Sequence, residues 1–126
     1  MEIRIENGYE IKPDAYLREA NLGEANLERA NLGGANLKYT NLEGAYLGGA
    51  NLIEANLYEA NLRDADLREA KLMEANLGRA DLRGAYLNGA DLYEANLGRA
   101  DLLGVKIDDG QGNVYECQKD GWGIVA

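Results

Sequence analysis

Leucine recurs at every fifth position from Leu17 to Leu102 without a gap. Alanine stands two residues before each of these leucines, except at Thr40. The residue between the two is Asn ten times and Asp four times, and the two residues after leucine are mostly charged residues, glycine or tyrosine. The chain is therefore built on a five-residue unit, Ala-(Asn/Asp)-Leu-x-x, in 19 consecutive copies from Ala15 to Asp109.

A period of five fits neither an α-helix nor a straight strand. In a helix, a step of five residues rotates the chain by about 140°, so the leucines would be spread over every side. In a strand, an odd period would place successive leucines on opposite faces. The pattern instead predicts a chain that turns by about 90° once per unit, so that four units close one coil. The 19 units then form an all-β solenoid of about 4.75 coils, with alanine and leucine inside.

The other positions of the unit match the turns that this path requires. Eleven of the 16 glycines lie at the two positions after leucine, where a tight turn favours a positive φ angle. Asn and Asp at the middle position tolerate turn conformations and can bond to their own main chain. Thr40 is small enough to point inward like alanine, and we expect its hydroxyl to bond to a main-chain carbonyl.

This run of units in register resembles the pentapeptide repeat family. The resemblance implies a right-handed quadrilateral parallel β-helix, with leucine as the central inward residue and alanine as the second. The family includes quinolone-resistance proteins, which resemble DNA in shape and charge and act on DNA gyrase, and many members without an established activity. The resemblance covers the repeats and implies little about either end of the chain.

Both ends require caps, because a solenoid leaves unpaired strand edges and an open apolar interior. Residues 1–13 are predicted to form an N-terminal hairpin cap, residues 14–109 the β-helix, and residues 110–126 a C-terminal cap of the same domain. In the hairpin we expect a three-residue loop, residues 6–8, with Gly8 left-handed. The resulting cross-strand pairs would be Ile5 with Tyr9, Ile3 with Ile11, and Arg4 with Glu10.

The C-terminal segment is predicted to contain a hairpin between residues 105–107 and 114–117. The acidic, glycine-rich residues 108–113 lack the alternating Asp/Asn series, the glycine and the distal glutamate of a calcium loop, so we interpret them as a hairpin turn. The last residues are more apolar than a free tail. We expect them either to lie over the last coil or to form a homodimer contact, as the C-terminal ends of the family sometimes do; the candidates are Trp122, Ile124 and Val125.

Composition narrows the function. With 13 basic and 22 acidic residues, the net charge is −9, which argues against direct binding to nucleic acid or to an anionic membrane surface. Without His or Ser the chain has no Ser-His-Asp triad and no imidazole ligand, and carboxylates on a smooth prism share no cleft. We therefore expect no enzyme, no cofactor and no metal. No apolar run could span a bilayer or form a signal-peptide core, and Cys117 has no disulfide partner, so a cytoplasmic location is expected.

Residues 20 apart stack, so the outward positions sort into four faces of the solenoid. Face 1 begins at Leu17, face 2 at Leu22, face 3 at Leu27 and face 4 at Leu32. Face 1 carries four cations and two acids, net +2, whereas faces 2, 3 and 4 have net charges of −3, −2 and −3. On face 3, Asp66 lies between Tyr46 and Tyr86, and we interpret these tyrosines as corner packing.

Face 4 carries two adjacent outward columns, an apolar one and an acidic one. They are Ile53, Met73 and Tyr93 beside Glu54, Glu74 and Glu94. An exposed apolar column bordered by carboxylates suits a protein partner with an apolar strip and basic flanks. The alternative is that these side chains only shield the neighbouring coils.

These observations favour a non-enzymatic structural or protein-binding solenoid that presents flat, mostly acidic faces to an unknown protein partner. The alternative is a DNA mimic that modulates a type II topoisomerase such as gyrase. Mimicry is weakened by a rod of only about 23 Å, by interleaved charges and by one cationic face. Two oligomeric states stay open, a monomer and a homodimer through the C-terminal end.

Overall fold

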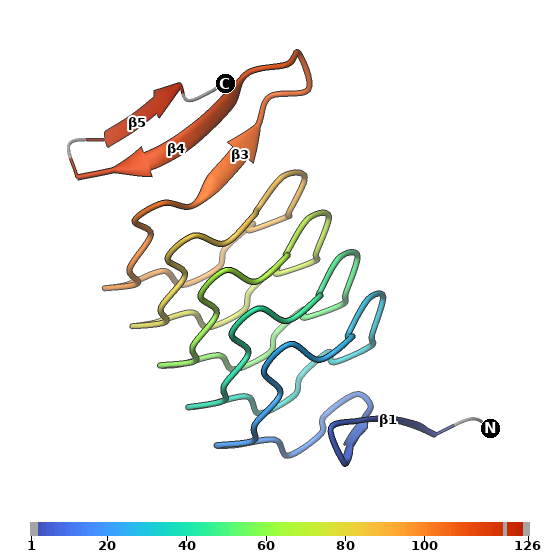
Figure 1. Cartoon of the computed structure of the whole chain (residues 1–126). Coiled ribbons are helices and arrows are strands. Elements are labelled where there is room, and N and C mark those ends of the chain that lie inside the picture. Colours follow the sequence, from blue (N-terminus) through green and yellow to red (C-terminus); the bar gives the residue numbers. More distant parts are fainter. Residues whose placement is uncertain (1–2, 120, 125–126) are drawn as a thin grey trace.

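The computed structural model describes residues 3–119 and the main chain of residues 121–124. The chain forms a stack of coils between an N-terminal hairpin and a C-terminal sheet (Figure 1). Fifteen parallel bridges join residues 20 apart, from Tyr16 with Asn36 to Tyr86 with Lys106. The predicted coil of four five-residue units is therefore confirmed. The described residues include no helix long and apolar enough to cross a membrane.

Leucine and alanine fill the interior as the period predicts. Twelve consecutive leucines, from Leu22 to Leu77, are among the fully buried side chains, and the alanines between them are buried as well. The narrow interior leaves room for one large and one small side chain on each side of a coil. Thr40 takes an alanine position, is fully buried, and donates a hydrogen bond from Oγ1 to the carbonyl of Leu17 at 2.8 Å, as expected.

Each corner is a turn over the two residues that follow leucine. The N–H of Ala20 donates to the carbonyl of Leu17 at 3.0 Å, and the same bond recurs along the chain. The second outward residue has a positive φ, for example 62° at Glu19, whereas the first does not. The predicted positive φ thus belongs to the second position only. Asn21 closes the corner from the middle position, because its Oδ1 accepts from the N–H of Gly23 at 3.2 Å.

The N-terminal hairpin consists of β1 (Arg4–Glu6) and β2 (Tyr9–Ile11). The expected three-residue loop is wrong, because the strands pair Arg4 with Ile11, Ile5 with Glu10 and Glu6 with Tyr9. Asn7 and Gly8 have φ angles of 51° and 85°, and two left-handed residues form the two-residue turn that fits the twist of a hairpin. As a result, Ile3 and Ile5 are exposed and Arg4 faces the first coil.

Side chains of this hairpin satisfy the free edge of the first coil. Arg4 donates from Nη1 to the carbonyl of Glu28 at 2.8 Å and from Nη2 to the carbonyl of Asn26 at 2.9 Å. Asn7 Nδ2 donates to the carbonyls of Asn21 and Gly23, at 3.5 and 3.3 Å. In later coils such carbonyls accept from the main chain of the preceding coil. The hairpin therefore replaces a missing coil.

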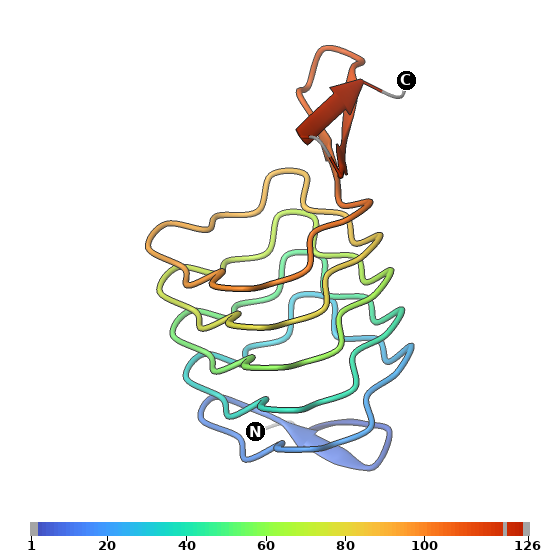
Figure 2. The same cartoon turned by 90° about the vertical axis from the view of Figure 1, so that its left-hand side faces the viewer.

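At the other end, β3 (Lys106–Asp108), β4 (Val114–Gln118) and β5 (Gly121–Ile124) form an antiparallel sheet in that order. The predicted hairpin in this segment is confirmed by the pairing of β3 with β4. The sheet continues one wall of the β-helix beyond the last coil (Figures 1 and 2). The predicted contacts of the Trp122 and Ile124 side chains and of Val125 lie outside the described residues.

Candidate binding surfaces

The structure stacks the apolar column of face 4 as predicted. The N–H of Glu54 donates to the carbonyl of Met73 at 3.0 Å, and the N–H of Glu74 donates to the carbonyl of Tyr93 at 2.9 Å. Ile53 and Met73 are partly buried, whereas Tyr93 is 68% exposed. The first two side chains therefore shield the turns in part, and the tyrosine is free to contact a partner.

Glu54, Glu74 and Glu94 form an exposed acidic column beside it. All three are in the left-handed conformation, with φ between 57° and 59°. The pKa of Glu74 is raised chiefly by a hydrogen bond with the carboxyl of Glu54, and next by one with the carboxyl of Glu94. Charge repulsion by both carboxylates raises it further. This column is therefore a concentrated source of negative charge.

Two of the cations on face 1 lie over tyrosine rings. The guanidinium carbon of Arg18 lies 4.9 Å from the ring centroid of Tyr39. Lys38 Nζ lies 5.7 Å from the Tyr39 centroid and 5.6 Å from that of Tyr58. The two rings meet edge to face, with centroids 6.2 Å apart. Sequence analysis found the cations of this face but not these contacts.

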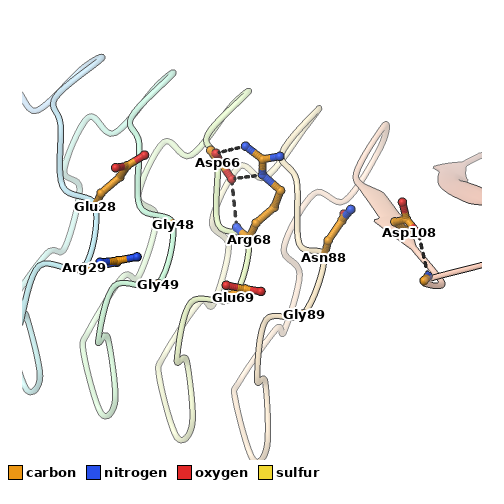
Figure 3. Close-up of a pocket in the computed structure, with 11 residues that line it drawn as sticks. Glu28, Arg29, Gly48, Gly49, Asp66, Arg68, Glu69, Asn88, Gly89 and Asp108 are labelled. Carbon is orange, nitrogen blue, oxygen red and sulfur yellow. Dashed lines mark hydrogen bonds and ion pairs between the residues drawn. The ribbon is translucent and has the colours of Figure 1, made fainter. Parts of the chain in front are cut away.

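Face 3 carries a groove of about 580 Å³, shown in Figure 3. Gly48 and Gly49 line it and place no side chain between the coils on either side. Arg68 lies at its edge and binds Asp66 through two hydrogen bonds, of 2.8 and 2.7 Å. This contact lowers the pKa of Asp66 and raises that of Arg68. The other lining residues are Glu28, Arg29, Glu69, Asn88, Gly89, Asp108 and Gly110.

A second groove, of about 550 Å³, lies where faces 2 and 3 meet; we name it the corner groove. It shares the Asp66–Arg68 pair with the groove of Figure 3. Tyr46 and Tyr86 line it and are 51% and 41% exposed, so packing at the corner leaves much of each ring open to solvent. The remaining lining residues are Glu24, Gly44 and Asp64.

Sequence analysis missed both grooves, although a signal was present. Gly44, Gly48 and Gly49 stand at outward positions of two consecutive units, and each lies between longer side chains one coil to either side. A gap in a column becomes a groove because the coils above and below carry long side chains. Counting charge by face could not reveal it.

Carboxylates are frequent on this surface, so a metal site has to be considered. Within residues 3–119, no group of three acidic or cysteine side chains could hold a metal ion. The acidic loop after β3 is closed by its own bonds: Asp109 accepts from Gln111 N–H and Asn113 Nδ2, each at 2.8 Å. The Asn113 bond is the main reason that the pKa of Asp109 is lowered.

On face 2, acidic and basic side chains alternate in space. Arg83 binds Asp81 through two hydrogen bonds, of 2.9 and 2.7 Å, and its Nε lies 3.6 Å from a carboxylate oxygen of Asp101. The pKa of Asp81 is lowered chiefly by the hydrogen bond from Arg83. Near Arg83 the acidic charge of this face is therefore locally neutralised, so it does not form one continuous stripe.

Stacked four-sided coils with a leucine and alanine interior define a solenoid of the parallel β-helix class. The protein-family model of pentapeptide repeats matches residues 14–49, 35–72 and 70–107, which together cover well over half of the chain. The chain belongs to the pentapeptide repeat family. Its expected fold, a right-handed quadrilateral β-helix, is confirmed.

Solved structures include similar proteins. One is a pentapeptide repeat protein from the thylakoid lumen of Arabidopsis thaliana, 31% identical over 79% of this chain and 71% of that chain, with a TM-score of 0.59. Another, from the cyanobacterium Cyanothece 51142, is 39% identical over 77% of this chain and 59% of that chain, with a TM-score of 0.52. This chain thus spans less than two thirds of the second protein.

A more distant structure is QnrB1, a plasmid-mediated fluoroquinolone resistance protein, at 23% identity and a TM-score of 0.24. This similarity is too low to carry an argument about function. A comparison with curated protein sequences found no match.

Proposed function

We propose that the protein is a non-enzymatic scaffold that binds a protein partner through its outer faces. The observation that carries the proposal is the stacked column of Ile53, Met73 and Tyr93, which lies at outward positions of the repeat rather than in the leucine and alanine interior. The adjoining glutamates add negative charge along the same line. A partner with an apolar strip and basic flanks would match both columns.

The substitutions Ile53→Lys and Met73→Lys test this proposal together. Both residues point outward, so the double variant should keep the thermal stability of the wild type within a few degrees. It should lose the proteins that immobilised wild type retains from a lysate, and these should then be purified for direct titration. Leu103→Lys, an exposed apolar residue on face 2, is the control and should retain them. Retention by the double variant would contradict the proposal.

The alternative function is DNA mimicry directed at a type II topoisomerase. The contacts of Arg83 with two aspartates on face 2 and the cationic face 1 favour the scaffold instead, because a mimic of DNA needs continuous rows of negative charge. A supercoiling assay with gyrase separates the two functions. Inhibition by the protein at low molar excess would favour mimicry, and no effect at high excess would favour the scaffold.

A further inference from the structure

Tyrosine rings on this protein already bind cations. Lys106 Nζ lies 5.2 Å from the ring centroid of Tyr86, and Tyr39 and Tyr58 contact cations on face 1 in the same way. Such contacts are attractive because the face of an aromatic ring is electronegative. Tyr46 is 51% exposed, and no cation from the described residues lies over its ring. Its ring is therefore an open surface for a cation.

Two carboxylates in the same groove also lack partners. Glu24 and Asp64 form no ion pair or side-chain hydrogen bond with any other residue that the structure describes. Asp66, in contrast, is held by Arg68. The groove thus carries three carboxylates and one guanidinium, and it is also lined by Tyr46.

Gly44 makes the space between these carboxylates. It stands in one column with Glu24 and Asp64, one coil from each. A Cβ atom at Gly44 would lie 3.3 Å from Cγ of Glu24, so a side chain here would fill the groove. The main chains at the two acids are two coils apart, about 10 Å along the axis, so their carboxylates are too far apart to share one metal ion, whereas a planar guanidinium placed between them reaches one with each edge.

We propose that the corner groove binds an arginine side chain presented by an extended, basic segment of a protein partner. The plane of the guanidinium stacks on Tyr46, and its N–H groups donate to Glu24 and Asp64. Arginine fits better than lysine because only a planar cation can stack on the ring and bond to a carboxylate at its edge. This site rests on the proposed scaffold function and adds a second contact, on a different face from the column of Ile53.

A labelled peptide of alternating arginine and glycine tests the site by fluorescence anisotropy. Glu24→Gln with Asp64→Asn should weaken binding by about tenfold or more, since hydrogen bonds to charged groups are among the stronger ones. Glu19→Gln with Glu59→Gln changes the net charge equally, at the same position of the repeat unit on face 1, and should change affinity by less than about twofold. The same peptide with citrulline for arginine should not bind.

Gly44→Arg supplies a second, independent test. It places the protein's own guanidinium between Glu24 and Asp64. The left-handed conformation at this position is tolerated, because Arg29 and Arg79 adopt it at equivalent positions. The variant should fold and lose the peptide, whereas Gly89→Arg, with equal added charge on face 3, should retain it.

Equal weakening by the two neutralised pairs, or peptide binding by Gly44→Arg as tight as by Gly89→Arg, would reduce the site to diffuse attraction by net charge and overturn the proposal. The outcome is separable from that for the scaffold function. Ile53→Lys with Met73→Lys should leave peptide affinity within about twofold of wild type. If the partner is still lost on Ile53→Lys with Met73→Lys, but the peptide does not distinguish the groove variants from their controls, the groove is refuted and the scaffold function stands.

Discussion

The two ends of the β-helix are closed to different extents. At the N-terminal end, Ile11 and Leu17 are buried, and the hairpin of β1 and β2 donates hydrogen bonds to carbonyls of the first coil. At the C-terminal end, Leu92, Leu97 and Leu102 are partly exposed. The sheet of β3, β4 and β5 continues one wall and leaves the other sides of the last coil uncovered by described residues (Figure 2).

The repeat therefore specifies the sides of the solenoid but not its ends. The N–H of Leu72 donates to the carbonyl of Asp91 in the next coil at 2.8 Å, and the N–H groups of Leu92 and Leu97 have no such acceptor among the described residues. A terminal coil also loses half of its stacking contacts. We therefore expect the first coil to be as stable as the central ones and the last coil to open first.

The largest expected effect comes from shortening a central leucine. Leu57→Ala removes a fully buried side chain and should lower the free energy of unfolding by about 2 to 5 kcal/mol. Leu97→Ala removes the same atoms from a partly exposed site and should cost about half as much or less. Urea denaturation followed by circular dichroism measures both. Equal losses would mean that the last coil is covered in solution as fully as the centre.

A smaller effect is expected from the N-terminal cap. Arg4→Ala removes two charge-assisted hydrogen bonds to carbonyls of the first coil and should lower stability by about 1 to 2 kcal/mol, since the bonds are exposed to water. Arg99→Ala, at the open end, removes an exposed side chain without a hydrogen bond among the described residues and should change stability by less than about 0.5 kcal/mol. Thermal unfolding compares the two variants. An equal shift in Tm would show that the bonds from Arg4 do not stabilise the N-terminal end.

The smallest expected effect concerns the acidic column of Glu54, Glu74 and Glu94, which runs along face 4 toward the C-terminal end. The pKa of Glu74 is raised above its ordinary 4.5, so its contribution favours folding below that pH and is lost as the pH rises through the raised value. At pH 7 the ionised column repels itself. Glu74→Gln should therefore raise Tm slightly at pH 7 and leave it unchanged at pH 4, whereas Glu59→Gln should leave Tm unchanged at both pH values. An identical change in Tm at both pH values would contradict this reading.

The interior could be predicted from sequence because only one chain path keeps every fifth leucine inside. The same period identified the stacked columns, including that of Ile53, Met73 and Tyr93. Thr40 could be placed with a partner because a buried hydroxyl requires one. The constraint on the interior acts on every unit alike, so the same prediction is made many times along the chain.

The ends and the grooves could not be predicted in the same way. The predicted hairpin register is wrong because it gathers the apolar residues on one face and pairs Arg4 with Glu10, whereas Arg4 pairs with Ile11 and bonds to carbonyls of the first coil. The length of the turn depends on whether Asn7 is left-handed, and because the hairpin lies outside the repeats, no equivalent position in the chain indicates this. The corner groove is lined by residues of successive coils, from Glu24 through Gly44 to Asp64, so it depends on how neighbouring coils stack rather than on any one unit.

Hydrogen–deuterium exchange read by mass spectrometry tests most directly whether the hairpin closes one end while the other stays open. Amides in residues 20–34 should be as protected as those in residues 50–64, because the hairpin replaces the missing coil. Amides in residues 90–102 should exchange about tenfold faster or more, since they lack a covering coil. Equal protection of the last and the first coil, or faster exchange in the first, would contradict the difference between the two ends.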